Sequence, residues 1–166
     1  MIIGIPPLRL CSGSEVQRNM DKPKVFTLEE AQSLVPVLKS LLKTAMDGKR
    51  ILEQVERESL ELTHRIKVSG GFRVDIVKRA RRLAERDKAL QETKDALAEI
   101  DSIGVQVKDL DIGLLDFPCV VEGETILLCW KYGEEKLEYW HGLEEGFQGR
   151  KPIDERIRGK KKEKPN

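Results

Sequence analysis

The feature that most constrains the fold is a run of apolar and small residues that recur every three or four positions between Leu38 and Ile66. Side chains at this spacing fall on one face of an α-helix. The run continues for about four heptads, which is typical of a helix packed along its length against another helix. The seam consists of Leu38, Leu41, Ala45, Gly48, Leu52, Val55, Ser59, Leu62 and Ile66.

The start of this helical region carries two opposing signals. Thr27 and Glu30 have the spacing of a capping box, in which each side chain binds the other residue's backbone N–H. Pro36 then removes a backbone donor. We therefore expect a short first helix that ends or kinks near Leu34, and a new helix that begins at Pro36.

A second helix is expected from about Val74 to Ile103, after a turn at Gly70 and Gly71, with Gly104 as its C-terminal cap. The short turn predicts an antiparallel hairpin over residues 27–103. The expected seam of the second helix is Ile76, Ala80, Leu83, Asp87, Leu90, Lys94 and Leu97, which would place Ile76 near Ile66 and Lys94 near Gly48.

Beyond Gly104 the apolar residues alternate, which predicts strands at about 105–110, 113–121, 125–132 and 136–141. Pro118 indicates an edge position or a bulge. The expected fold class is α+β, a long coiled-coil-like antiparallel helical hairpin followed by a small antiparallel β-meander at 105–150. We expect one domain over 25–154, a disordered extension at 1–24 and a disordered basic tail at 155–166.

Composition limits the function classes. Charged residues make up 36% of the 166 residues and aromatic residues 5%, which favours solvated helices around a narrow core. No apolar run is long enough to cross a membrane. Three cysteines without a CxxC pair are typical of reduced thiols, so we expect a cytoplasmic protein.

The stretch "ILLCWKYGEEKLEYWHGL" at 126–143 holds most of the chain's unusual side chains. A metal site here would gather Cys119, Cys129, His141 and Asp116, but their spacing matches no standard zinc pattern. A thiol site would pair Cys129 with His141. We predict buried cysteines and a hydrogen-bonded histidine, with no metal and no cofactor, and keep Cys129 and His141 as the nearest metal candidates.

A basic surface is the other candidate site. Residues 72–88 carry seven basic and three acidic side chains, and such a helix can hold phosphates without reading sequence. No aromatic residue interleaves with the charges to stack on bases, so a solvated helix exterior is the preferred interpretation. The phosphate-binding candidates are Arg79, Arg81, Arg82 and Arg86.

Several motifs together resemble a prokaryotic domain-of-unknown-function family, numbered 2203. They are "VFTLEEAQSLVP", "GVQVKDLDIGLLDFP", "LCWKYGE", "YWH" and "GFQGRKPID", which lie between Val25 and Asp154. The resemblance implies domain boundaries and signature positions, but no activity. Those positions are Asp116, Phe117, Pro118, Cys129, Trp130, Glu134, Trp140, His141, Gly146 and Arg150.

The function expected from these features is a non-enzymatic assembly or protein-interaction module, with a second copy of the chain as the preferred partner and another protein as the alternative. A small metal-dependent or thiol enzyme is the first alternative, and phosphate or nucleic-acid binding is the second. The candidate functional cluster is Asp116, Cys129, Trp130, Glu134, Trp140, His141 and Arg150.

Overall fold

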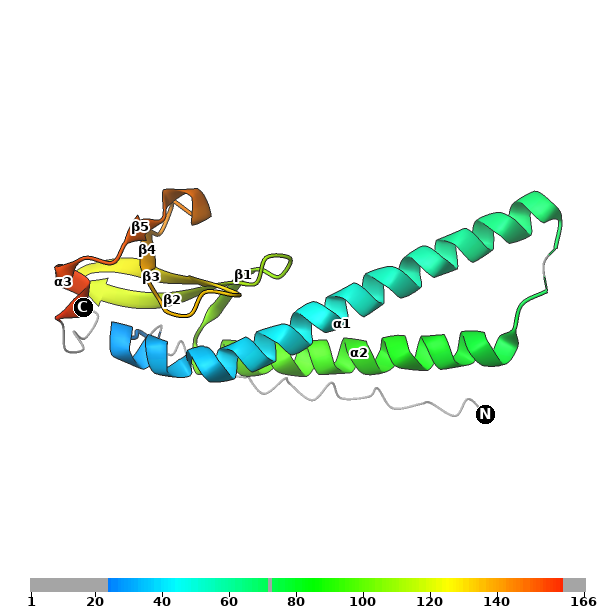
Figure 1. Cartoon of the computed structure of the whole chain (residues 1–166), viewed down its shortest axis with the longest axis horizontal. Coiled ribbons are helices and arrows are strands. Elements are labelled where there is room, and N and C mark those ends of the chain that lie inside the picture. The colour runs from blue at the N-terminus through cyan, green and yellow to red at the C-terminus, as the bar shows by residue number, and fades with distance from the viewer. Residues whose placement is uncertain (1–23, 72, 160–166) are drawn as a thin grey trace, which may run out of the picture.

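The computed structural model describes residues 24–71 and 73–159. Two long helices come first, and a five-stranded sheet, a 3₁₀ turn and a short helix follow (Figure 1). The α+β class is confirmed. The elements are α1 Leu28–Ser69, α2 Ile76–Ile103, β1 Gln106–Asp109, β2 Leu114–Val121, β3 Glu124–Lys131, β4 Tyr139–Gly142, η1 Phe147–Gly149, β5 Lys151–Pro152 and α3 Glu155–Arg158.

Helix α1 begins at the predicted capping box. The Thr27 backbone N–H donates to Glu30 Oε2 at 3.0 Å, and the Glu30 N–H donates to Thr27 Oγ1 at 3.2 Å. The predicted end of the first helix near Leu34 is wrong, because α1 continues through Pro36. Pro36 is exposed between the buried Val35 and Leu38, and their packing outweighs the one hydrogen bond that the proline removes.

Helix α2 lies antiparallel to α1, and Gly104 caps it in the left-handed conformation, as predicted. Its predicted seam is wrong by one position. The buried residues are Ala89, Thr93, Ala96 and Ile100, whereas Leu90 is 39% exposed. Gly48 faces Thr93 rather than Lys94. The face with small side chains packs inward because it lets the two helices approach closely. This close packing outweighs the hydrophobic free energy that burial of the larger leucines would give.

The hairpin opens toward its turn. Figure 1 shows α1 and α2 diverging as they approach residues 70–75. We call residues 56–71 and 73–88 the distal arms; none of their side chains is buried. Ile66 and Ile76, which were expected to lie near each other, are 40% and 78% exposed.

The sheet is an antiparallel meander in the order β1-β2-β3-β4-β5. Glu122 and Gly123 both have positive φ in the turn between β2 and β3. Pro118 lies on an inner strand, but the β1–β2 pairing reaches only as far as Asp116. The position is therefore a local edge, where the Pro118 carbonyl accepts from the Phe26 N–H at 2.7 Å.

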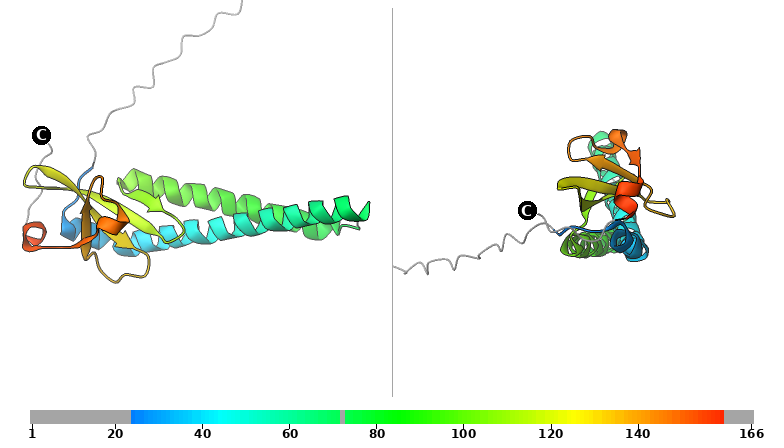
Figure 2. Two further views of the ribbon diagram at one scale, coloured as in Figure 1. Left: turned by 90° about the horizontal axis from the view of Figure 1, so that it is seen from above. Right: turned by 90° about the vertical axis from the view of Figure 1, so that its left-hand side faces the viewer.

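One face of the sheet packs on the start of the hairpin. Leu115, Phe117, Leu128 and Trp130 join residues of both helices in one core. The end-on view of Figure 2 shows the sheet on one side of the helix pair. No helix in the described ranges is long and apolar enough to cross a membrane.

The C-terminal boundary of the domain differs from the expected one. Residues 155–158 form α3, and Ile157 is buried in the core, so this part of the predicted disordered tail is ordered. The disorder predicted for residues 1–23 and 160–166 lies outside the described residues.

Candidate functional site

Three polar side chains are buried on the sheet face that points away from the helices. Asp116 on β2 pairs with Cys129 on β3, and His141 on β4 pairs with Leu127 on β3. Cross-strand partners share a face, and next-but-one residues on a strand do so too. Asp116, Cys129 and His141 are only 1%, 0% and 2% exposed. They form a compact group that we call the Asp-Cys-His cluster.

The imidazole of His141 is fixed at both nitrogens. Nδ1 lies 2.7 Å from the Gly142 carbonyl oxygen, which can only accept, so Nδ1 carries a proton and donates it. Nε2 lies 3.3 Å from each carboxylate oxygen of Asp116. One candidate ligand atom from each of Asp116, Cys129 and His141 lies within 4.8 Å of the other two.

Arg150 contacts residues in and around this cluster. Its Nη2 donates to Glu134 Oε2 at 2.8 Å and to the Cys129 carbonyl at 3.2 Å. Its guanidinium carbon lies 4.2 Å from the ring centroid of Tyr139. The backbone N–H of Lys131 also donates to Glu134, at 2.8 Å. This clamp holds the turn after β3 against the segment that precedes β5.

The two tryptophans point to the other face. Trp130 lies in the core and donates from Nε1 to the Glu134 carbonyl at 3.1 Å. Trp140 packs against the core and donates from Nε1 to the Pro152 carbonyl at 3.2 Å. The predicted cluster therefore divides: Asp116, Cys129, Glu134, His141 and Arg150 gather on the outer side, and the tryptophans pack toward the helices.

Tyr139 is a further neighbour of the cluster that is not among the candidate residues named from the sequence. It pairs with Cys129 across the strands and lies under the Arg150 guanidinium. Its alternation with His141 in "KLEYWH" already places both on one face. That alternation was a usable signal, but the contact with Arg150 depends on a fold-back of residues 143–150 that has no periodic pattern.

Residues 24–153 match the family DUF2203, described as an uncharacterized conserved protein. The chain belongs to this family. The match covers the whole hairpin, the sheet and every member of the Asp-Cys-His cluster. No curated protein and no solved structure matched the chain. The DUF2203 assignment thus confirms the predicted family and supplies no role for any residue.

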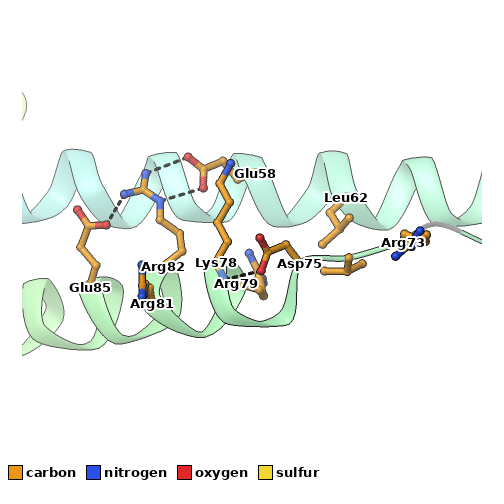
Figure 3. A pocket seen from close by; sticks show the side chains of 10 residues that line it. Glu58, Leu62, Arg73, Asp75, Lys78, Arg79, Arg81, Arg82 and Glu85 are labelled. Atoms are coloured by element: carbon orange, nitrogen blue, oxygen red, sulfur yellow. Dashed lines mark hydrogen bonds and ion pairs between the residues drawn. The ribbon is translucent and has the colours of Figure 1, made fainter.

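The phosphate-binding candidates of this DUF2203 chain lie on α2. Arg79, Arg81 and Arg82, but not Arg86, line a cleft of about 590 Å³ between the distal arms (Figure 3). Arg82 donates to both oxygens of Glu58 at 2.9 Å and to Glu85 at 2.6 Å. Arg79 donates to Ser59, and Arg86 donates to Asp87. Acidic neighbours therefore offset the charge of Arg82 and Arg86, which weakens the case for phosphate binding.

The thiol of Cys129 is held in its protonated form. Burial and then the negative charge of Asp116 raise the pKa of Cys129 from 9.0 to about 12, against the opposing effect of Arg150. The thiolate is the nucleophilic form of cysteine. A buried thiol with this pKa is not activated for attack on a substrate, so the geometry does not favour a thiol enzyme.

This pKa predicts a stability that depends on alkaline pH. The unfolded chain loses the thiol proton near pH 9, whereas the folded chain keeps it toward pH 12. The contribution is therefore complete below pH 9, and the free energy of unfolding falls by up to about 1.4 kcal/mol per pH unit above it. Urea unfolding at a series of pH values above 9, with a chelator present, should show that the free energy of unfolding falls more steeply with pH for the wild type than for Cys129→Ser. Equal slopes would show that the thiol titrates normally.

Proposed function

We propose that this chain is a non-enzymatic assembly module that forms a homodimer through its distal arms. The observation that carries the proposal is the absence of buried side chains in residues 56–71 and 73–88. These arms expose large aliphatic side chains that a lone hairpin leaves in water: Leu60, Ile66, Val68, Val74, Ile76 and Val77. A covered surface would recover their hydrophobic free energy.

The contacts between the arms do not supply that burial. Arg82 on α2 binds Glu58 on α1, and Arg79 donates to the Ser59 hydroxyl at 2.7 Å. One of these contacts is a part-buried, bidentate ion pair and the other a hydrogen bond, and neither buries an apolar side chain. Most helical stability in proteins comes from packing of an apolar face. We therefore infer that a partner packs against the distal arms.

Charge favours a second copy as that partner. Residues 56–88 carry ten basic and six acidic side chains, a net charge of +4, and residues 105–150 carry four basic and ten acidic side chains, a net charge of −6. Two copies with antiparallel hairpins would place each basic arm near the acidic sheet of the other copy. This arrangement is closed and two-fold symmetric, which is the commonest form of soluble oligomer.

Single charged substitutions in the arms test the interface. Val68 is 72% exposed and Ile76 is 78% exposed. Val68→Lys adds a cation near the end of α1, and Ile76→Glu adds an anion at the start of α2, so both suit the helix dipole and should fold normally. Each should raise the dimer dissociation constant at least about tenfold, measured by sedimentation velocity, because a charge must be buried in the interface.

Val37→Lys is the matched control. Val37 lies on the same helix and is 51% exposed, but it lies outside the distal arms. It should dimerise like the wild type, and circular dichroism should be the same for all these chains. Equal dissociation constants for Val37→Lys and Val68→Lys, or a wild type that remains monomeric at high concentration, would refute the proposal.

A further inference from the structure

The Asp-Cys-His cluster contains a close contact between two groups that can both act as hydrogen-bond acceptors. The His141 Nδ1–H donates to the Gly142 carbonyl, so a neutral imidazole presents the lone pair of Nε2 to the Asp116 carboxylate at 3.3 Å. The other neutral tautomer would turn the Nδ1 lone pair toward the carbonyl at 2.7 Å. Each neutral form therefore sets two acceptors against each other in a buried site. A second proton or a cation must lie between Nε2 and Asp116.

The distances favour a cation over a proton. A hydrogen bond from an imidazolium to a carboxylate is typically about 2.7–2.9 Å long, but Nε2 lies 3.3 Å from both oxygens of Asp116. Zinc–nitrogen and zinc–oxygen bonds of about 2.0–2.1 Å in a tetrahedron place their donor atoms about 3.3 Å apart. The candidate sulfur ligand of Cys129 also lies within 4.8 Å of the other two donors.

We propose that Asp116, Cys129 and His141 bind a divalent transition-metal ion, through a carboxylate oxygen, the thiolate sulfur and Nε2. This mixed oxygen, sulfur and nitrogen set suits zinc and excludes magnesium and calcium, which take oxygen ligands. One carboxylate and one thiolate balance the two positive charges, so the occupied site is neutral, as burial requires. The fourth position is left for water or another small ligand.

The surroundings have the features of a metal site. A histidine ligand usually donates its second N–H to a carbonyl or carboxylate, which fixes the ring, and the His141–Gly142 contact does this. The ion would link β2, β3 and β4, because each strand contributes one ligand. Binding replaces the proton on the Cys129 sulfur, and that proton leaves to solvent.

Cobalt(II) binding to the chelator-treated full-length chain tests the site. Cobalt replaces zinc and gives an intense charge-transfer absorption only when a thiolate binds it. Because the chain has cysteines at 11, 119 and 129, a Cys11→Ser/Cys119→Ala double variant leaves Cys129 as the single thiol. We expect one cobalt per chain with the thiolate band in this variant, release of at least one proton, and displacement of cobalt by zinc.

Cys129→Ser is the paired variant, and it should lose the band and bind cobalt at least about tenfold more weakly. Zinc should also raise the melting temperature of the wild type, a measurement that needs no substitution. A wild type without the thiolate band and without a zinc-induced rise would overturn the proposal and identify the cluster as an imidazolium–carboxylate pair. A band that persists in Cys129→Ser would place the metal elsewhere.

Discussion

Replacing Trp130 by alanine should lower the free energy of unfolding by about 3–5 kcal/mol, the cost of removing a large buried aromatic side chain. Trp130 is fully buried in the core that the sheet forms with the helices, and its ring meets Tyr132 edge to face at 6.2 Å between centroids. Domains of this size are stable by only about 5–15 kcal/mol. We therefore expect a fall in melting temperature of about 10 °C or more.

Two further tryptophan variants distinguish the loss of ring packing from the loss of the hydrogen bond. Trp130→Phe keeps an aromatic ring but leaves the Glu134 carbonyl without its donor, and it should cost about 1–3 kcal/mol. Trp140→Ala removes a half-buried ring on the same sheet face and should cost less than Trp130→Ala. Urea unfolding measures all three. If Trp130→Ala and Trp140→Ala cost the same, the core is not centred on Trp130.

Replacing Gly48 by leucine should destabilise the chain by about 3 kcal/mol, although glycine is a poor helix former. In an exposed helix the exchange of glycine for another residue gains up to about 1 kcal/mol. Here a Cβ atom on residue 48 would lie 2.0 Å from Thr93 Oγ1 and 3.1 Å from the Ala89 carbonyl oxygen. The helices would have to separate, and overpacking of this kind costs about 1–3 kcal/mol or more.

A double-mutant cycle tests the cause. Gly48→Ala should destabilise the wild type, and it should cost at least about 1 kcal/mol less in a Thr93→Ala background, where the hydroxyl that it meets is absent. Chemical denaturation gives the four free energies. A stabilising Gly48→Ala in the wild type would mean that the helices are farther apart at this point than the structure places them.

Local signals predicted the two long helices and the first four strands, but not η1, β5 or α3. Thr27 and Glu30 marked the start of α1, Gly104 marked the end of α2, and the change from a helical to an alternating pattern marked the sheet. These signals act between near neighbours in the chain. They failed where tertiary packing decides, as at Pro36, which α1 passes through, and at the α2 seam, where Thr93 is buried and Leu90 is exposed.

The candidate site was only partly predictable for the same reason. Alternation can assign Cys129 to one strand face and His141 to one face of the next strand, but it cannot fix the register that brings Asp116 to the same point. That register depends on turn lengths and on packing over the helices. The direction of the His141 ring depends on the Gly142 carbonyl, which no side-chain pattern records. The sequence alone therefore predicted buried cysteines and no metal.

Amide hydrogen exchange at two protein concentrations, one well above and one well below the dimer dissociation constant, tests the assembly proposal most directly. We predict that the amides of residues 56–71 and 73–88 exchange more slowly at the higher concentration, while those of residues 38–55 and of the sheet are unchanged. Identical exchange of the distal arms at both concentrations would contradict the account, because it would mean that no second copy covers them.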